Sequence, residues 1–415
     1  MSAILLTNIK KLAGVQEQPT ILRGAAMAEL PCIDEAYLLI EDGFISTFGE
    51  MRDMPPGFQM LKGEALLDLR GQFVLPAWCD SHTHLVFAAS REQEFIDKIK
   101  GLSYAEIAAK GGGILNSARK LNETSEEELF NQAWQRLEEV SRLGTGAIEI
   151  KSGYGLSIEG ELKMLRVIRK LRERSRLSIK SSFLAAHTYP PEYRDNHQGY
   201  IDLIIQKMLP LVAGEKLADY IDVFCETGFF SPEETETICR AGMGYGLKPK
   251  IHANQLNLSG GTETGVKLGA ISVDHLETMD EKAIQALAHS GTIGTLLPTA
   301  AFFLRMPFQP ARQLIDAGCA VAIASDYNPG SSPSGNMNLV LSMSCIQMRM
   351  LPEEAINAAT INGAHAMELA GELGSIAIGK KANLVITRPV PSLAYLPYAF
   401  GSNLLDRVII GGEIV

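Results

Sequence analysis

The sequence predicts an α/β protein, a (β/α)8 TIM-like barrel with a small β-sandwich domain formed by both chain termini. Three observations predict it. Eight short apolar runs alternate with helix-like stretches, both ends of the chain have strand-like patterns, and histidines follow several of the predicted strands. We predict that residues 1–72 and 373–415 form the small domain and that residues 73–372 form the barrel.

The two ends of the chain are predicted to be β-rich. In EAYLLIEDGFISTFGE (35–50), two apolar runs flank Asp42-Gly43, a pair that tolerates the positive φ angles of a tight hairpin turn. The C-terminus has the same texture, with GSIAIGKKANLVI at 374–386 and a second hairpin candidate, RVIIGGEIV, at 407–415. Both ends are therefore expected to join one small sheet domain.

The middle of the chain is predicted to supply the barrel. Amphipathic stretches of helical length lie between the strand candidates, among them 161–174 and 231–246, which begins with a Ser-Pro-Glu-Glu order typical of a helix N-terminus. The long connection 85–144 is expected to carry a substrate loop. The eight strand candidates are FVLPAWC (73–79), TGAIEIK (145–151), SIKSSFLAA (178–186), YIDVFC (220–225), KPKIHA (248–253), ISVDH (271–275), TIGTLLP (292–298) and AVAIASD (320–326).

Composition excludes several classes of partner and location. The chain has 38 basic and 48 acidic residues, a net charge of -10, and no long basic run, so nucleic acid is not expected as a partner. The apolar stretch at the N-terminus is too short for a signal-peptide core, and no segment approaches the ~18 apolar residues of a membrane span. We expect a cytoplasmic protein without membrane contact. The six cysteines show no CxxC spacing, which indicates buried free thiols rather than disulfides or a zinc-thiolate site.

Metal-binding residue types follow several predicted strands. Barrel enzymes carry their sites at the carboxyl ends of the strands. A histidine pair spaced by one residue, as in His82 and His84, points both imidazoles to one side of an extended segment. A lone pair of this kind is more often incidental. However, His252 and Asp326 are predicted at the same end of the barrel, and this coincidence favours a metal site.

Three imidazoles and one carboxylate suit a divalent ion, Zn²⁺ or Fe²⁺, and leave a coordination position for water. A bound ion lowers the pKa of that water towards about 7, so hydroxide becomes available at neutral pH. The pattern therefore predicts a metal-dependent hydrolase.

The segments around these residues resemble the imidazolonepropionase family of the amidohydrolase superfamily. HxH and DHLE alone indicate only the superfamily, whereas SREQEF, IKSGYG, the HxxPPEY pattern and DYNPGSSP are more specific. The resemblance covers most of the barrel, in DSHTHLVFAASREQEF (80–95), KGGGIL (110–115), EIKSGYGL (149–156), FLAAHTYPPEY (183–193), DVFCETGFFS (222–231), KIHANQLNLSGG (250–261), DHLE (274–277) and SDYNPGSSP (325–333).

This resemblance implies hydrolysis of the ring amide of 4-imidazolone-5-propanoate to N-formimidoyl-L-glutamate, the third step of histidine degradation. It also implies a homodimer. Binuclear amidohydrolases often carry a carboxylated lysine at the end of strand four, where this chain has Phe224-Cys225-Glu226. One divalent ion per subunit is therefore expected.

A small substrate with a propionate group requires a cation and a few directed hydrogen bonds. Arg91 is the expected carboxylate clamp, although it could instead form a structural ion pair. The resemblance implies that further residues hold the carboxylate or the ring, or line the pocket after strand eight. Of these, Tyr104 could instead pack an insertion helix. They are Tyr104, Tyr154, His187, Asn328, Gly330 and Ser331.

For the chemistry, we expect His275 or Asp326 to take the proton of the attacking water and pass it to the departing nitrogen. Gln255 occupies the position where related deaminases place a proton-shuttling glutamate. Because an amide does not titrate, Gln255 is expected to orient substrate or water.

Two alternatives remain open from the sequence. The first is a deaminase or another cyclic-amide hydrolase on the same barrel, against which Gln255 and Arg91 argue. The second is a non-catalytic scaffold, against which the complete set of metal-binding residues argues. A nucleotide-binding interpretation of Gly111–Gly113 is disfavoured because the Lys-Ser/Thr ending of a P-loop is missing.

Overall fold

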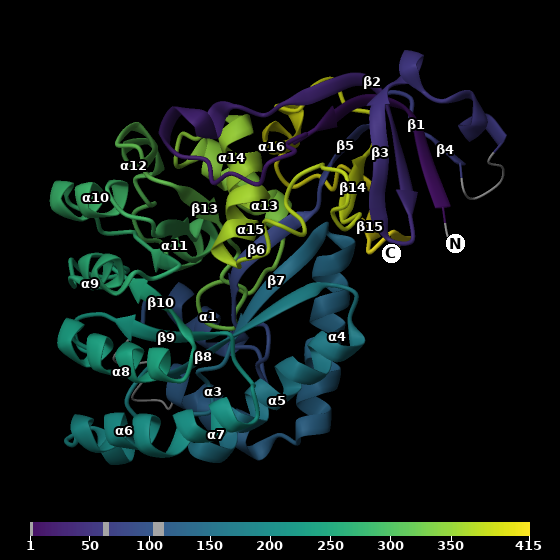
Figure 1. Ribbon diagram of the computed structural model, residues 1–415. Helices are drawn as coiled ribbons and strands as arrows, with labels where there is room; N and C mark the ends of the chain where they lie inside the picture. Colours follow the sequence, from purple (N-terminus) through teal and green to yellow (C-terminus); the bar gives the residue numbers. More distant parts are fainter. Residues whose placement is uncertain (1–2, 61–65, 103–111) are drawn as a thin grey trace.

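The computed structural model describes residues 3–60, 66–102 and 112–415. Figure 1 shows a barrel of strands surrounded by helices and, beside it, a second sheet where both chain termini lie. Each of the two sheets has eight strands. The predicted fold class, an α/β barrel accompanied by a sheet from both termini, is confirmed.

The barrel sheet has parallel neighbours throughout, in the order in which its strands occur along the chain. A parallel bridge between Thr83 and Tyr327 brings the last strand back to the first, and the Asp326 amide donates to the His82 carbonyl oxygen at 3.0 Å. The strands are β6 (Trp78–Thr83), β7 (Thr145–Lys151), β8 (Ser178–Ala186), β9 (Tyr220–Cys225), β10 (Lys248–Ala253), β11 (Ser272–His275), β12 (Ile293–Leu296) and β13 (Val321–Ile323).

The first strand candidate, 73–79, divides between the two sheets. β5 (Phe73–Pro76) pairs with strands of the terminal sheet, whereas β6 begins the barrel at Trp78. The change occurs at Ala77, whose amide still donates to Asn383, while the amide of Trp78 donates to Gly144 on the barrel side. The run is apolar throughout because both halves are buried, so its pattern did not reveal the division.

The helices that surround the barrel start where the sequence provides caps. Ser125, Ser157 and Ser231 each accept a hydrogen bond from a backbone amide in the first turn of the following helix. The helix predicted over 161–174 starts earlier, at Ile158. These helices are α4 (Glu126–Arg142), α5 (Ile158–Arg174), α6 (His197–Leu203), α7 (Leu209–Gly214), α8 (Pro232–Gly244), α9 (Gly261–Leu268), α10 (Glu281–Ala288), α11 (Pro298–Leu304) and α12 (Ala311–Asp316).

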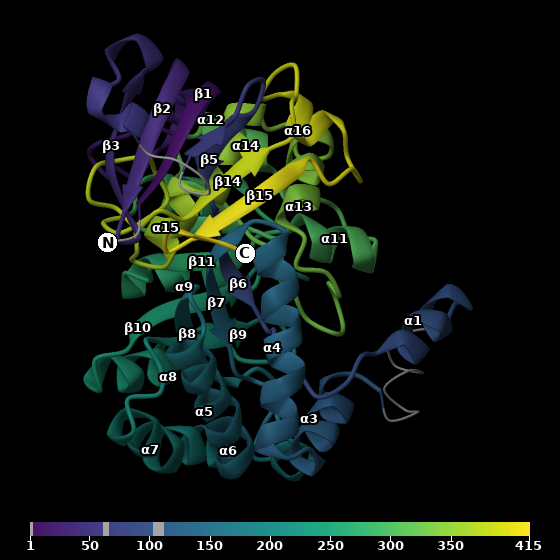
Figure 2. The same cartoon turned by 90° about the vertical axis from the view of Figure 1, so that its right-hand side faces the viewer.

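Helices also occupy the long connection after β6 and the chain after β13. Figure 2 shows α1 standing away from the barrel on the connection that leads to α3. The connection 85–144, which was expected to carry a substrate loop, thus contains helices of its own. These helices are α1 (Glu92–Ile99), α3 (Ile114–Glu123), α13 (Met337–Ile346), α14 (Pro352–Ala359), α15 (Ile361–Ala366) and α16 (Tyr395–Tyr398).

The second sheet joins the two ends of the chain, because β5 pairs with β1 on one side and with β14 on the other. Both predicted hairpins are present, one between β2 and β3 and one between β15 and β16. The division of the chain into two domains at the predicted boundaries stays a prediction. The remaining strands are β1 (Ala3–Ala13), β2 (Cys32–Glu41), β3 (Phe44–Glu50), β4 (Leu66–Asp68), β14 (Leu384–Thr387), β15 (Leu405–Ile410) and β16 (Glu413–Ile414).

The two hairpin turns also contact each other, which explains their glycines. Gly43 and Gly412 have φ angles of 88° and 80°, a region that other residues rarely adopt. A Cβ atom on Gly412 would lie 2.6 Å from Cα of Gly43. Side chains of both chain ends, including Leu38, Val74 and Leu384, then share one apolar core.

Two sequence-based expectations concern the whole chain. None of the six cysteines forms a disulfide, as predicted, and four of them are buried. Across residues 3–60, 66–102 and 112–415, no helix combines the length and the apolar character needed to cross a membrane.

Candidate metal centre and substrate pocket

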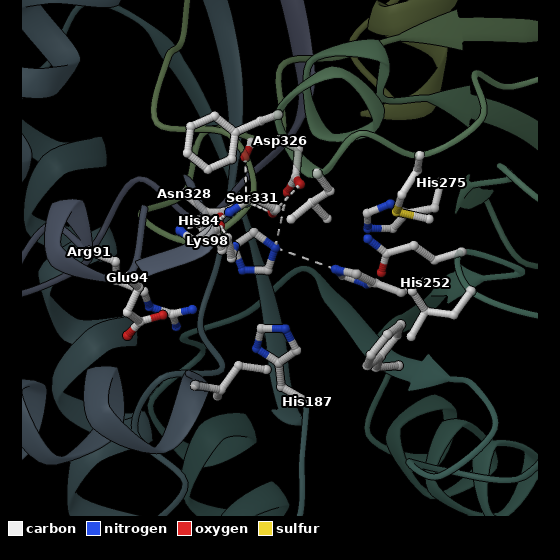
Figure 3. A pocket seen from close by; sticks show the side chains of 18 of the residues that line it. His84, Arg91, Glu94, Lys98, His187, His252, His275, Asp326, Asn328 and Ser331 are labelled. Carbon is white, nitrogen blue, oxygen red and sulfur yellow. Dashed lines mark hydrogen bonds and ion pairs between the residues drawn. The ribbon is translucent and has the colours of Figure 1, made fainter. Parts of the chain in front are cut away.

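A cavity of about 760 Å³ lies at the carboxyl ends of the barrel strands, as expected for a site on this fold. Figure 3 shows His84, His252, His275 and Asp326 converging on one side of it and Arg91 on the other. The cavity thus joins a cluster of imidazoles to a cation.

The structure brings all four predicted metal-binding residues together. His84 Nε2 lies 3.4 Å from His252 Nε2 and 3.6 Å from Asp326 Oδ1, and His82 Nε2 lies 3.5 Å from the same carboxylate oxygen. Two overlapping groups have ligand atoms within 4.8 Å of one another: His82, His84 and His252, and His82, His275 and Asp326. His275 is therefore close enough to take part in the same centre.

The donor atoms of this cluster fit a bound cation. His82 Nε2 and Asp326 Oδ1 are buried and have no hydrogen-bond partner, a costly state unless another group satisfies them. Burial and neighbouring positive charges hold the pKa of His82, His84 and His252 well below the ordinary histidine value. The imidazoles are therefore neutral, and neutral nitrogen is the form that binds a metal.

The backbone is strained where two of these residues lie. Asp326 has a φ angle of 53° and His275 one of 89°, in the left-handed region that is unfavourable for residues with a Cβ. Such strain typically persists where the surrounding structure fixes a functional side chain. Here His275, the last residue of β11, and Asp326, which follows β13, both line the cavity.

His82 and His252 each contact a buried aspartate through Nδ1. His82 Nδ1 lies 2.7 Å from Asp274 Oδ2, and His252 Nδ1 lies 3.0 Å from Asp222 Oδ1. A carboxylate in this position selects the tautomer with the proton on Nδ1 and leaves Nε2 free for a ligand. Neither aspartate was predicted as a site residue.

His275 and Asp326 differ from the other ligand candidates in their charge environment. Burial lowers the pKa of His275, but Glu277, 3.3 Å from Nδ1, and Asp326 raise it above its ordinary value. Burial raises the pKa of Asp326 to about 6, although His275 and the Ser331 hydroxyl, which donates at 3.0 Å, oppose this shift. The pKa values of both groups are therefore raised, that of Asp326 by burial and that of His275 by its acidic neighbours.

Arg91 places an unpaired donor at the other side of the cavity. Its Nε donates to Ser117 Oγ at 2.9 Å, and its Nη2 is buried without a partner. The guanidinium lies 5.8 Å from the ring centre of Tyr154. A Cβ atom on Gly330 would lie 2.4 Å from Nη1, so glycine is needed for the arginine to lie here. The role of Arg91 as the carboxylate clamp stays a prediction.

Tyr154 and His187 line the cavity next to His84. The His187 ring stacks on that of His84, with centroids 5.2 Å apart and planes 15° apart. Burial lowers the pKa of His187 to about 4, although its Nδ1 lies 3.0 Å from the Gly153 carbonyl oxygen. Burial raises the pKa of Tyr154, so its hydroxyl stays protonated. Both side chains are thus neutral hydrogen-bonding groups.

The loop that carries Tyr154 is held by a buried carboxylate. Glu161 accepts hydrogen bonds from the amides of Gly155 and Leu156, at 2.7 and 2.9 Å, and from that of Gly153 at 3.1 Å. Glu161 is fully buried at the start of α5. It was not predicted, although a glutamate in the first turn of a helix next to a glycine-rich loop is a recognisable pattern.

The segment after β13 forms a compact loop. The amides of Gly330 and Ser331 both donate to Asn328 Oδ1 at 2.8 Å, and the Asn328 amide group donates to the Ser331 hydroxyl at 2.6 Å. All three residues line the cavity, as predicted. The Asn328 side chain itself is used to shape the loop.

Gln255 also lines the cavity, and its loop is held in the same way. Glu226, which follows β9, accepts hydrogen bonds from the amides of Leu256 at 2.8 Å and Asn257 at 3.3 Å. The predicted site residue Tyr104 lies outside the described residues.

Several cavity residues come from places that the sequence did not single out. Lys98, from α1, lies 3.4 Å from the Gly330 carbonyl oxygen and 5.8 Å from the ring centre of Phe303. Glu94 and Phe95 lie in the SREQEF segment, although neither was predicted as a site residue. The cavity residues outside every motif are Lys98 on α1 and Phe303, Leu304 and Met306 at or just after the end of α11.

Comparison with known proteins identifies the family of the chain. Residues 73–415 match the amidohydrolase family. An imidazolonepropionase of Flavobacterium johnsoniae is 58% identical over 412 residues, which cover 99% of this chain and 99% of the relative. One of Brevibacillus brevis is 42% identical over 410 residues, which cover 99% of this chain and 96% of the relative.

Solved structures resemble the chain at much lower identity. Guanine deaminase of E. coli aligns with a TM-score of 0.71 at 14% identity, covering 100% of this chain and 99% of that one. A triazine hydrolase variant aligns with a TM-score of 0.74 at 15% identity, covering 100% and 94%. These likenesses show a shared fold alone.

The family match and the histidine-rich cluster together indicate a divalent metal ion at this centre and an enzyme with a small-molecule substrate. The near-complete coverage at high identity defines the group more narrowly. The chain belongs to the imidazolonepropionase family of amidohydrolases.

Proposed function

We propose that this chain hydrolyses the ring amide C–N bond of 4-imidazolone-5-propanoate to give N-formimidoyl-L-glutamate, the third step of histidine degradation. The observation that carries the proposal is the 58% identity, over 99% of both chains, to a protein named imidazolonepropionase. The site agrees with it, because one cavity holds an imidazole cluster and an unpaired arginine donor.

The metal ligands in this proposal are His82, His84, His252 and Asp326. Their support is the convergence of ligand atoms and the unpartnered buried nitrogen and oxygen described above. A single Zn²⁺ or Fe²⁺ suits this set. When bound, the ion would supply Lewis-acid activation of the ring carbonyl and of water. The buried Lys151 is at the end of the second barrel strand, not the fourth, and is ion-paired to Glu149 and Asp222, which favours one ion over two.

Arg91 is proposed to bind the propionate carboxylate. A guanidinium with a free, desolvated N–H donor forms a strong charge-assisted hydrogen bond with a carboxylate. The neutral side chains of Tyr154 and His187, between Arg91 and the imidazole cluster, are proposed to hold the ring. Asn328, Gly330 and Ser331 would complete the pocket wall, and Tyr104 is retained as a further substrate contact from the resemblance.

His275 and Asp326 are proposed to manage protons. A group with a pKa near the working pH transfers protons most effectively. Glu277 and Asp326 raise the pKa of His275, and burial raises that of Asp326 to about 6. One would accept the proton of the attacking water and the other would give a proton to the departing ring nitrogen. Gln255 would orient the substrate or water through its amide, since it cannot exchange a proton.

The direct test is to incubate the purified chain with 4-imidazolone-5-propanoate, made in place from urocanate by urocanase, and to detect N-formimidoyl-L-glutamate by mass spectrometry. Metal content is measured on the same sample and is expected to be one divalent ion per chain. Turnover of guanine or cytosine, with none of the imidazolone, would favour the deaminase alternative. Absence of turnover with all of them would favour a non-catalytic scaffold.

The predicted homodimer and the cytoplasmic location are proposed from the resemblance. Light scattering after size exclusion would test the dimer, with a mass of twice 45.1 kDa as the expected result.

A further inference from the structure

Beneath the imidazole cluster, the barrel interior holds a network of buried charges. The network has two lysines and three carboxylates, all fully buried, where barrels of this kind usually pack branched apolar side chains. Buried charges are costly unless each one is paired. Its members are Glu149, Lys151, Asp222, Lys250 and Asp274.

Lys151 lies at the branch point of this network. Its Nζ is 2.6 Å from Glu149 Oε1, 2.7 Å from Asp222 Oδ2 and 3.5 Å from Asp274 Oδ2, so the three donors of the ammonium have three carboxylates to meet. Burial alone would lower the pKa of Lys151, but Asp222, Glu149 and Asp274 raise it above the ordinary value. The ammonium is therefore permanently charged.

The two aspartates connect this ammonium to the proposed metal ligands. Asp222 uses Oδ2 for Lys151 and Oδ1 for His252, so one carboxylate is held between the two groups. Asp274 uses Oδ2 both for Lys151 and for His82, while its Oδ1 accepts the Ser272 hydroxyl at 2.5 Å. Rotation of either carboxylate would break a contact with Lys151.

We propose that Lys151 is a positioning residue of the metal centre. By fixing Asp222 and Asp274 together, it would hold His252 and His82 with Nδ1 as the donor and Nε2 aimed at the ion. One cation would thus orient two ligands that come from different strands, β6 and β10. The proposal rests on the ligand set of the proposed function.

Lys250 provides a matched comparison. It is equally buried and also pairs with Glu149, but its other contacts are backbone oxygens, those of Ser81 at 3.1 Å and Ala366 at 3.2 Å. It acts on Asp222 and Asp274 only through space, by lowering the energy of their charged forms without a hydrogen bond. Lys250→Met therefore removes a buried cation of the same network without removing a donor to either aspartate.

The test measures zinc affinity on the zinc-loaded chain by competition with a chromophoric chelator of known affinity. Lys151→Met is expected to weaken zinc binding by about 10–100-fold, the usual effect of losing a group that orients metal ligands. Lys250→Met is expected to bind zinc close to the parent level, with a comparable fall in melting temperature. Equal weakening in both variants, or unchanged binding in Lys151→Met, would overturn the positioning role.

If Lys151→Met does not fold, the protonation of the histidines and of Lys151 can be measured by NMR on the parent chain. With ¹⁵N-labelled histidine and lysine, His82 and His252 should carry the proton on Nδ1, and the Lys151 ammonium protons should be protected from solvent exchange. Protons on Nε2, or a freely exchanging ammonium, would contradict the proposal.

The zinc affinity of His252→Asn, measured in the same titration, distinguishes failure of the proposed metal centre from failure of the proposed role of Lys151. If this variant binds zinc like the parent, or if the parent does not bind one zinc per chain, the proposed metal centre itself is wrong and the role of Lys151 falls with it. If His252→Asn loses zinc but Lys151→Met does not, only the positioning role is refuted.

Discussion

Gly330→Ala should weaken substrate binding because it displaces the side chain of Arg91. A Cβ atom at this position would lie 2.4 Å from Arg91 Nη1 and 3.0 Å from Cζ, whereas ordinary contact begins at 3.4 Å. The guanidinium would have to move by about 1 Å, the difference between 3.4 and 2.4 Å. The backbone at Gly330 does not have a positive φ angle, so alanine adds no backbone strain.

The size of the effect can be worked out from the contact that would be lost. A hydrogen bond to a charged group contributes about 1.5–3 kcal/mol, which corresponds to about 10–150-fold in kcat/KM. Because Arg91 is held at Nε by Ser117, displacement would misdirect Nη1 and Nη2 rather than release the side chain. Stability should change by less than about 0.5 kcal/mol, since the guanidinium is the movable end of a long side chain.

The assay is steady-state hydrolysis of 4-imidazolone-5-propanoate, with kcat and KM determined separately. The loss should appear mainly in KM, because the carboxylate is remote from the bond that breaks. Gly371→Ala is the control, since a Cβ there meets nothing within 4 Å. It should leave both constants unchanged.

A double-mutant cycle with Arg91→Met decides whether Gly330 acts through the arginine. If it does, adding Gly330→Ala to Arg91→Met should lower kcat/KM little further, because the contact between Arg91 and the substrate is already absent. A full additional loss in the Arg91→Met background would refute the reasoning. So would a Gly330→Ala variant with parental kcat/KM.

Three further predictions concern the centre and the loop beside it. Asp326→Asn should lower kcat by about 10³-fold, because disruption of a catalytic metal centre raises the activation free energy by several kcal/mol. The circular dichroism spectrum should stay unchanged. Turnover at the parent level would show that the centre is not catalytic. Removing the metal with a chelator should abolish activity. Zinc or ferrous iron at about 100 times its dissociation constant should restore activity and raise the free energy of unfolding by about 2.7 kcal/mol. A melting temperature that does not depend on the metal would contradict this prediction. Glu161→Gln should lower the free energy of unfolding in urea by about 1–3 kcal/mol, because the NH2 group that replaces one carboxylate oxygen cannot accept a backbone N–H. It should also raise KM through Tyr154, and unchanged unfolding would contradict the role of Glu161.

The strand ends were predictable because barrel geometry brings them together. Each β-branched run was apolar enough to identify, and parallel strands place the residues at their carboxyl ends on the same side of the barrel. This is why His82, His252 and Asp326 could be grouped although they are far apart in the sequence. The assignment failed only at the edge, where the run around Pro76 is apolar in both of the sheets it connects.

The pocket wall opposite the imidazoles was harder to predict. Lys98 and Phe303 come from α1 and α11, and no periodic pattern relates two helices that meet only through their side chains across a cavity. Arg91 was found because a motif includes it, not because its neighbours could be inferred. Predictions from one sequence therefore work best where the main chain alone fixes the geometry.

The charged interior was missed for a different reason, and that reason bears on how the centre works. Glu149 and Lys151 are two residues apart on β7, and Lys250 and His252 are two apart on β10, so each pair projects to one side of its strand, into the barrel. Charged residues in short strands are normally taken to face solvent. Here the alternation that brings His82 and His84 to one side also points the charged residues of neighbouring strands into the barrel. The proposed ligands and the charges that orient them therefore contact one another inside it. Loss of Lys151, which contacts both aspartates, should therefore weaken metal binding, whereas loss of Lys250, which donates to neither, should lower stability alone.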